Sequence, residues 1–567
     1  MTRMSAGAAI FARLKALGVS HVYGNSGTDF PPIVEGLARA AEMGLALPEP
    51  VIAPHEHAAM GMAHGAWLAT GRLQAVMLHT DVGLANGVIG ALNAAQDQVP
   101  VIVMSGRTPT VEGGRFGART VPIGWGQEMR DQHALIRECA KWDYELRFPE
   151  QIGPLLDRAA AIALSPPMGP VYLSLPREVL AEEIEIEGEA PSAVSPPGLA
   201  APAAEIERAA ALFAAAERPL IFAQRGGGSP DGLAALGRIA ADWAAPLTDW
   251  WAVEPGVPRD HPSWIGWAAG PALAAADAAL VVDSLAPWSP DIHKAPEGLK
   301  VVQLGPDPLM ARTPVRTHPA AVTLATETAG GLLALEAALR PHLAGAAERI
   351  ASRRPQVEAA HAAALADARK MAEVAPGAPM TKGFVSARLA AALGRRTGGE
   401  AALVLSELGA PYAPMGLAAP ARWRQEPHAG GLGWSLPAAL GAKLAEPERL
   451  VVATMGDGSF IFANPVACLQ IAAATGLAPV VLVLNNAEWG AVRHSVLGMY
   501  PEGAAARANR MPFVSLAGSP DFAKIAEAGG AFGLRVEAAD ALDAALDAAL
   551  TESAAGRLAL IDIAISG

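Results

Sequence analysis

The chain has 567 residues, of which 51% are hydrophobic, enough for three or four domains of ordinary size and too many for a disordered protein. Lys and Arg total 43 against 56 Asp and Glu, so the net charge is −13. A surface with this balance repels phosphate backbones and anionic lipid heads, and we therefore expect no nucleic-acid and no membrane partner. The two cysteines, Cys139 and Cys468, are too few for a disulfide framework and are compatible with a reducing compartment.

The start of the chain predicts an amphipathic helix rather than a signal peptide. Ile10, Leu14 and Leu17 recur at helical spacing, while Arg13 and Lys15 interrupt the apolar stretch. No run of about 20 apolar residues, the length of a transmembrane helix, occurs along the sequence. We therefore expect the protein to be cytoplasmic.

Short runs of Val, Ile and Leu alternate with Ala-rich helical stretches along the whole chain. Apolar strands of this kind, buried on both faces and separated by helices, are typical of parallel sheets in α/β layers. Stretches rich in Pro, Gly and Ala at 188–205 and 374–383 indicate linkers. The sequence thus predicts an α/β protein with three doubly wound parallel-sheet domains, at residues 1–187, 200–345 and 378–567.

Two polar motifs follow apolar strands near the C-terminal end. The turn Gly456-Asp457-Gly458-Ser459 follows one strand, and Asn486 follows the next. Because the carboxyl ends of parallel strands meet at one edge of a sheet, Asp457 and Asn486 can converge there. A carboxylate and a neutral amide oxygen are ligands that Mg²⁺ prefers beside phosphate, and Ser459 opens a helix whose amides can hold an anion. Each turn alone is common, but together they predict a magnesium and phosphate site.

The GDG turn and the later Asn-Asn pair resemble the signature of the thiamine-diphosphate-dependent enzyme superfamily. The resemblance implies that the three domains are the pyrimidine-binding, central and diphosphate-binding domains. It implies that Asp457, Asn486 and the backbone carbonyl of Glu488 hold Mg²⁺, which in turn holds the diphosphate. It also implies a homo-oligomer, a dimer or a tetramer, with sites at the subunit interface, since the family's two half-sites come from different subunits.

Glu56 opens an Ala- and Gly-rich helix in the N-terminal third of the chain. An acidic residue in a first helical turn is ordinarily only a partner of the helix dipole. The resemblance implies a catalytic role, because the family's matching Glu hydrogen-bonds the aminopyrimidine and lets the cofactor deprotonate its own thiazolium carbon. The flanking His55 and His57 point in other directions, so we expect packing or surface roles for them.

Other segments are similar to benzoylformate decarboxylase and its relatives. Leu432 falls where the family places a bulky residue beneath the cofactor, although an ordinary core Leu is a fair alternative. Thr28 takes the place of a serine expected to meet the substrate carboxylate. His79, at a strand end, matches an active-site His of the decarboxylases, whereas a lone His there is more often structural. His293 is a second candidate, and a surface His is an equally good reading of it.

The remaining cofactor contacts that the resemblance implies lie in the turns around these motifs: Asn25, Gly83, Asn86, Gly409, Ala410, Gly430, Gly456, Gly458 and Ser459. At 407–410 relatives often carry hydroxyl residues that touch the diphosphate, so we expect backbone amides to serve in this chain. Gln127 and the stretch 495–517 look more like acetolactate synthase.

Three functions follow from these observations. The leading one is the non-oxidative decarboxylation of a 2-keto acid to an aldehyde with thiamine diphosphate and Mg²⁺. The second is an acetolactate-synthase-like carboligase that joins the activated substrate to a second carbonyl compound. The third is a non-catalytic nucleotide-binding homologue, in which the glycine turn at 224–228 would take an accessory nucleotide. The presence of Glu56, Asp457 and Asn486 argues against the third, and the substrate side chain is not identified.

Overall fold

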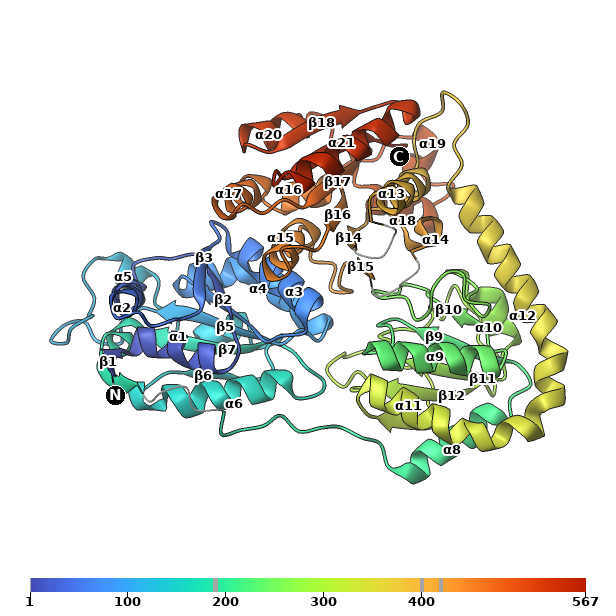
Figure 1. The fold of residues 1–567 in the computed structure, drawn as a ribbon, viewed down its shortest axis with the longest axis horizontal. Coiled ribbons are helices and arrows are strands. Elements are labelled where there is room, and N and C mark those ends of the chain that lie inside the picture. The colour runs from blue at the N-terminus through green and yellow to red at the C-terminus, as the bar shows by residue number, and fades with distance from the viewer. Residues whose placement is uncertain (1, 187–191, 398–401, 418–421, 567) are drawn as a thin grey trace.

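The computed structural model describes residues 2–186, 192–397, 402–417 and 422–566. It contains three parallel β-sheets, one in each third of the chain, and helices surround each sheet (Figure 1). The predicted α/β class with three doubly wound sheets is confirmed, and the limits of the three domains stay predictions. Within the described ranges, no helix is both long and apolar enough to cross a bilayer.

The N-terminal sheet has the strand order β3-β2-β4-β5-β7-β6. Successive residues of its central strands face opposite sides: Val76 and Val103 pack towards α3 and α4, whereas Met77 and Met104 pack towards α1 and α6. A small antiparallel pair, β1 (Thr2–Ser5) with β8 (Glu183–Ile186), joins the two ends of this domain. Its other elements are α1 (Ala6–Ala16), β2 (His21–Gly24), α2 (Pro31–Glu42), β3 (Glu49–Ile52), α3 (Glu56–Thr70), β4 (Gln74–Leu78), α4 (Thr80–Gln96), β5 (Val101–Arg107), α5 (Ile123–Gly126), β6 (Asp143–Glu145), α6 (Ile152–Leu164), β7 (Val171–Pro176) and α7 (Arg177–Leu180).

The central sheet has the order β10-β9-β11-β12-β13 and separates two apolar clusters, one on each face. The long helix α12 (Leu343–Met371) then runs along the outer edge of the molecule towards the C-terminal domain (Figure 1). The other elements are α8 (Ala203–Ala214), β9 (Pro219–Ala223), α9 (Pro230–Asp242), β10 (Leu247–Thr248), α10 (Gly270–Ala275), β11 (Ala278–Val282), β12 (Lys300–Gly305), β13 (Val322–Ala325) and α11 (Thr328–Leu339).

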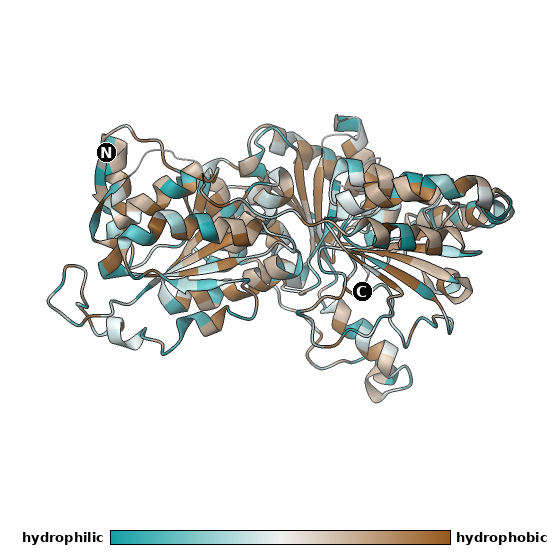
Figure 2. Ribbon diagram, turned by 90° about the horizontal axis from the view of Figure 1, so that it is seen from below, coloured by the Kyte–Doolittle hydropathy of each residue, from teal (hydrophilic) through white to brown (hydrophobic). Residues whose placement is uncertain are grey.

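The C-terminal sheet has the order β15-β14-β16-β17-β19-β18, and its apolar strands lie between helices (Figure 2). Because β14, β16 and β17 are parallel neighbours, their carboxyl ends lie side by side at one edge. The elements are α13 (Lys382–Thr397), β14 (Leu403–Glu407), α14 (Tyr412–Met415), β15 (Trp423–Gln425), α15 (Ser435–Ala445), β16 (Val451–Gly456), α16 (Asp457–Phe462), α17 (Pro465–Thr475), β17 (Val480–Asn485), α18 (Gly490–Met499), α19 (Ala504–Ala508), α20 (Phe522–Ala528), β18 (Phe532–Val536), α21 (Leu542–Ala554) and β19 (Ala559–Ala564).

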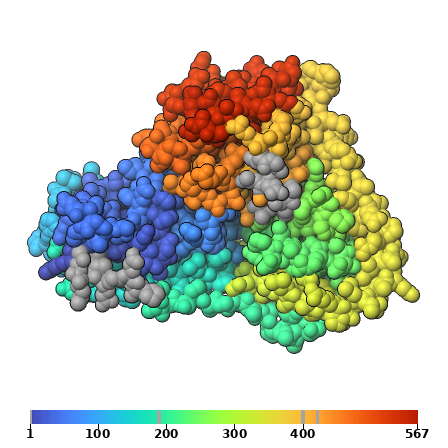
Figure 3. Space-filling model, in the orientation of Figure 1, coloured from blue at the N-terminus to red at the C-terminus, as the bar shows by residue number. Residues whose placement is uncertain are grey.

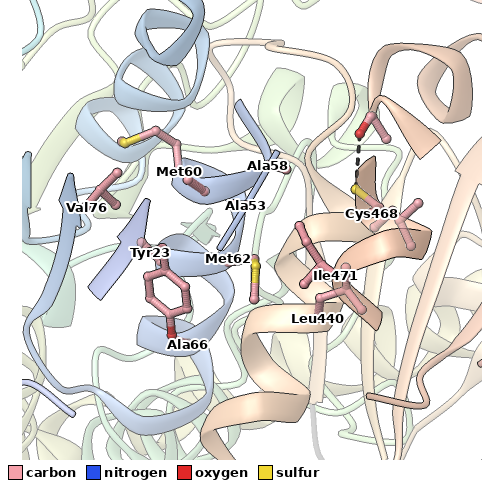
Figure 4. Close-up of a cluster of buried hydrophobic side chains, with 14 of the residues drawn as sticks. Tyr23, Ala53, Ala58, Met60, Met62, Ala66, Val76, Leu440, Cys468 and Ile471 are labelled. Carbon is pink, nitrogen blue, oxygen red and sulfur yellow. Dashed lines mark hydrogen bonds between the residues drawn. The ribbon is translucent and has the colours of Figure 1, made fainter. Parts of the chain in front are cut away.

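Helix α3 of the N-terminal domain packs directly on helix α15 of the C-terminal domain. A Cβ atom at Gly65 would overlap the carbonyl of Ala438, and one at Gly441 would overlap the carbonyl of Met62, so the two backbones touch. One apolar cluster continues across this contact, with Met62 on one side and Leu440 on the other (Figure 4). The C-terminal domain thereby lies against the N-terminal domain, and Figure 3 shows it in contact with the central domain as well.

The close contact of α3 with α15 predicts that Gly65→Ala destabilises the protein. The added methyl must push apart two backbones, which typically costs about 1–3 kcal/mol. Gly394→Ala in α13 is the matched control, because open space surrounds that glycine and the change should stabilise the helix by about 0.5–1 kcal/mol. Calorimetry should show a lower melting temperature for the first variant only. Equal melting temperatures for both would contradict the packing of α3 on α15.

Candidate functional site

The N-terminal half of the site is centred on Glu56, the first residue of α3, whose side chain is 6% exposed. The Nδ2 group of Asn25 donates to Oε1 at 3.0 Å, and the Nδ2 group of Asn86 donates to Oε2 at 3.1 Å. Gly83 lies so close that a Cβ there would be 3.0 Å from Oε1. The structure therefore brings together four of the predicted site residues and holds both carboxylate oxygens with neutral amide donors.

His79 follows β4 and caps the start of α4. Its Nδ1 atom lies 2.5 Å from Oδ1 of Asp29, and its Nε2 atom lies 3.2 Å from Nε2 of Gln127. Since a carboxylate only accepts, Nδ1–H donates to Asp29, and Nε2 is left to accept from the amide. The hydrogen bond to Asp29 raises the pKa of His79 above its ordinary value of 6.5. The ring fits because residue 27 is glycine, since a Cβ there would overlap it.

Thr28 and His293, the two proposed substrate contacts besides His79, lie in different parts of the fold. Thr28 is exposed, and it lines a small cleft together with Asp29 and Gln127, the two partners of His79. His293 belongs to the central domain, where its ring packs edge-on against Trp250 and its Nδ1 atom accepts from the amide of Ser289 at 3.2 Å. The contacts described within one chain thus place Thr28 near His79 and tie His293 to the central domain.

The C-terminal half of the site lies where β16 and β17 end. Asp457 begins α16 and is 2% exposed, and burial raises the pKa of its carboxyl. Its Oδ2 atom is buried and has no hydrogen-bond partner. Asn486 follows β17, and its Oδ1 atom accepts from the amide of Glu488 at 3.2 Å. A buried carboxylate oxygen without a partner is costly unless a cation binds it, so this donor set fits Mg²⁺.

The described residues contain no cluster of three or more His, Cys, Asp or Glu able to hold a metal ion by themselves. A metal at Asp457 would therefore take its other ligands from amide and backbone oxygens and from a phosphate group, which suits Mg²⁺. The neighbouring turn residues Gly456, Gly458 and Ser459 lie at the same sheet edge, at the end of β16 and the start of α16.

Leu432 lies in a glycine segment that is fixed from two sides. Asn93 of α4 accepts from the Gly431 amide at 3.1 Å and donates to the Gly431 carbonyl at 2.8 Å. Glu407, at the end of β14, accepts from the amides of Gly433 and Ser435 at 2.5 and 2.7 Å. Burial raises the pKa of Glu407 to about 7. Gly430, just before this segment, has a φ of +66°, a conformation that favours glycine.

Residues 408–410 are expected to hold the diphosphate through their backbone amides, but two of these amides already donate to groups of the protein. The Leu408 amide donates to Oε2 of Glu426 at 3.1 Å, and the Ala410 amide donates to the hydroxyl of Thr454 at 3.0 Å. Gly409 lies between them against the backbone of Thr454. Burial raises the pKa of Glu426 to about 7, so this edge of the sheet is rich in buried carboxyl groups.

The glycine turn of the central domain takes part in contacts between domains. Arg225 bonds Asp283 at 3.2 Å and the carbonyl of Gln96 in the N-terminal domain at 2.6 Å. A cavity of about 490 Å³ borders the turn. The charged residues that line it are four acids and two bases: Asp97, Glu254, Asp283, Glu327, Arg225 and Arg424. This acidic excess opposes the phosphates of an accessory nucleotide.

Several residues of the site were not predicted from the sequence. Asp29, which bonds His79, is an isolated acid within a loop, and only its place directly after Thr28 could have pointed to it. Asn93 bonds the backbone of Gly431, 338 residues away, and Glu426 bonds the amide of Leu408, 18 residues away. Such pairs have no local sequence pattern.

Two family models match the chain. The one described as "Thiamine pyrophosphate enzyme, N-terminal TPP binding domain" covers residues 4–135, and the one described as "Thiamine pyrophosphate enzyme, C-terminal TPP binding domain" covers residues 408–563. Thiamine pyrophosphate is another name for thiamine diphosphate. The two ranges include both half-sites described above.

Curated relatives match over most of their length. A probable 2-ketoarginine decarboxylase of Pseudomonas aeruginosa is 29% identical over 95% of this chain and 90% of its own. An acetolactate synthase large subunit of Mycobacterium tuberculosis is 30% identical over 88% and 86%. A benzoylformate decarboxylase of Pseudomonas aeruginosa is 28% identical over 85% of each chain.

A solved structure shares the fold. The thiamine diphosphate-dependent 4-hydroxybenzoylformate decarboxylase of Rhodococcus jostii superposes with a TM-score of 0.74 over 99% of both chains, at 23% identity. The two matched domains, the relatives and the geometry of the two half-sites all point to the same family. The chain therefore belongs to the thiamine pyrophosphate enzyme family.

Proposed function

We propose that this protein is a thiamine-diphosphate- and Mg²⁺-dependent enzyme that decarboxylates a 2-keto acid to an aldehyde without oxidation. The observation that carries the proposal is the pair of buried carboxylates in the two matched domains. Glu56 is held by the amides of Asn25 and Asn86, and Asp457 keeps one oxygen without a partner. Relatives named as 2-ketoarginine decarboxylase and benzoylformate decarboxylase support the reaction class.

The chain's own residues would divide the work as follows. Asp457, Asn486 and the backbone carbonyl of Glu488 would hold Mg²⁺ and, through it, the diphosphate. Glu56 would hold and exchange a proton at the pyrimidine ring, and Leu432 would support the cofactor from below. When bound, thiamine diphosphate supplies the thiazolium carbon and the electron sink that C–C cleavage next to a carbonyl requires.

Thr28 and His79 would act on the substrate. The cleft that contains Thr28 opens beside the partners of His79, so a carboxylate held at Thr28 lies within reach of a proton relay. The Asp29 carboxylate keeps Nδ1 protonated, which leaves Nε2 as the atom that takes up and releases a proton. His293 would join from the central domain as a second proton donor or acceptor.

A carboligase of the acetolactate synthase type is the second candidate. The side-chain amide nitrogen of Gln127 lies 3.2 Å from Nε2 of His79. An amide N–H that donates to Nε2 occupies the lone pair that would take up a proton, so it hinders the protonated form of His79 that aldehyde release requires. The acetolactate synthase relative at 30% identity supports the same reading. In that case the activated substrate would attack a second carbonyl compound instead of taking up a proton.

The surfaces next to both half-sites favour a homo-oligomer, a dimer or a tetramer, with sites between subunits. Apolar side chains are 40–66% exposed on α4, beside Asn86, and on α16 and α17, beside Asp457: Val82, Ile89, Leu92, Ile461, Phe462 and Val466. Exposed apolar side chains so close to functional groups are typical of surfaces that a partner covers.

A cytoplasmic location is part of the same proposal.

The reaction is tested by incubating the protein with thiamine diphosphate, Mg²⁺ and a panel of 2-keto acids, and by identifying the products by mass spectrometry. The proposal predicts an aldehyde and CO₂ from at least one acid, and no turnover after a chelator removes the metal. A 2-hydroxy ketone or a 2-hydroxy-3-keto acid as the main product would establish the carboligase instead. No product with any acid would contradict both candidates.

Glu56→Gln should bind thiamine diphosphate with near-normal affinity but should exchange the thiazolium C2 proton for deuterium about 10²-fold more slowly. Glutamine keeps the shape of the side chain, yet it cannot exchange a proton with the pyrimidine. Quenched-flow exchange followed by proton NMR measures this rate. Glu49→Gln, an exposed change on β3, is the control and should exchange as the wild type does. A wild-type rate in Glu56→Gln would reduce Glu56 to a helix-capping acid.

The pH dependence of turnover should report the His79–Asp29 pair. If protonated His79 donates the final proton, after CO₂ has left, kcat falls as the pH rises through a pKa that Asp29 holds above 6.5. Asp29→Asn removes the cause of that shift, so the alkaline limb of the profile should move to lower pH. His79→Ala should lower turnover by about 10²–10⁴-fold and abolish the limb. An unchanged profile in Asp29→Asn would exclude His79 as the titrating group.

A further inference from the structure

The first turn of helix α13 lies against the segment where the cofactor diphosphate is expected. Lys382, its first residue, donates from Nζ to the carbonyl of Leu408 at 2.5 Å. One turn later, the hydroxyl of Ser386 donates to the carbonyl of Pro411 at 2.6 Å. The helix start is itself anchored, because the amide of Phe384 donates to the hydroxyl of Thr381 at 3.1 Å. These contacts hold the Lys382 ammonium group beside Gly409.

The Lys382 side chain reaches into a cavity of about 510 Å³ between the central and C-terminal domains. Leu408 and Gly409 line the same cavity, and four aromatic side chains form much of its wall: Trp251, Trp267, Tyr412 and Trp423. Burial lowers the pKa of Lys382, whereas the charges of Glu426 and Asp457 raise it. The ammonium group therefore lies in the field of the metal-site carboxylate while it stays open to a ligand in the cavity.

The segment of this chain that is expected to hold the diphosphate offers few free hydrogen-bond donors. Leu408, Gly409 and Ala410 carry no hydroxyl groups, and the amides of Leu408 and Ala410 already donate within the protein. Two buried carboxyl groups, Glu407 and Glu426, also lie at this edge and repel an anion whenever they are ionised. A further positive charge at this edge would therefore favour the binding of a diphosphate.

We propose that Lys382 is a further cofactor-binding residue, whose ammonium group hydrogen-bonds the diphosphate of thiamine diphosphate beside Gly409. An ammonium group has three donors, and the contact with Leu408 uses one of them, so two remain for phosphate oxygens. Lys382 would thereby replace the hydroxyl groups that the segment lacks. The inference rests on the proposed thiamine diphosphate function and adds a residue outside the GDG and Asn-Asn motifs.

The test is the affinity of the full-length protein for thiamine diphosphate and for inorganic diphosphate, each measured by calorimetry with Mg²⁺ present. Lys382→Met keeps the apolar stem and removes the charge. It should weaken both ligands by the same factor, about 10- to 100-fold, the usual effect of one hydrogen bond to a charged group. The affinity of the variant should also fall less steeply with rising salt concentration than that of the wild type. Lys370→Met, an exposed change on α12, alters the net charge equally and should bind as the wild type does.

Lys382→Arg and Lys382→Gln keep the test decisive if the Met variant does not fold. Both retain a polar head group, but only Arg retains the charge, so Arg should keep most of the affinity and Gln should lose it. Equal affinities in Gln, Arg and wild type would overturn the role of Lys382, as would Lys382→Met binding both ligands as tightly as wild type does. A wild-type protein that binds neither ligand would instead contradict the proposed function itself.

Discussion

The direct backbone contact between α3 and α15 is the constraint that fixes how the two half-sites of one chain lie relative to each other. Gly65 and Gly441 leave no room between the two helices, so their relative position is fixed. Helix α3 begins with Glu56, and α15 follows the segment that carries Leu432. Asn93 bonds both backbone groups of Gly431 and adds a polar tie between the same two domains. Any shift of one domain on the other would therefore displace Glu56 and Leu432 relative to each other within the chain.

The polar groups of the two half-sites differ in a way that matches their proposed chemistry. Both oxygens of Glu56 accept hydrogen bonds from neutral side-chain amides, those of Asn25 and Asn86. One oxygen of Asp457 is buried and has no hydrogen-bond partner, which costs free energy that a bound cation would offset. Both carboxyl oxygens of Glu407 accept from backbone amides of the glycine segment, so this residue holds the segment in place. Burial alone thus does not distinguish these carboxyl groups, whereas their hydrogen-bond partners do.

The sequence predicted the parts of this structure that have a local pattern. Apolar strands predicted the three parallel sheets, and the ends of two such strands predicted that Asp457 and Asn486 share one sheet edge. Glu56 was placed by family resemblance, since its surroundings in the sequence are those of any helix start. The pairs His79–Asp29 and Glu407–Gly433 were not predicted, because they join residues distant in the chain whose contact depends on tertiary packing. Lys382 was not predicted either, because nothing near it in the sequence indicates an anion-binding site.

The central claim is that one catalytic centre combines the Glu56 half-site of one subunit with the Asp457 half-site of another. Complementation between two inactive variants tests it most directly. Glu56→Gln and Asp457→Ala chains are produced together in equal amounts, and turnover of the 2-keto acid substrate is measured. In randomly paired dimers half the molecules are mixed, and each mixed dimer contains one intact centre, so about a quarter of the wild-type activity should return. If both half-sites instead belonged to one chain, every centre would carry a defect, and the mixture would be as inactive as either variant alone.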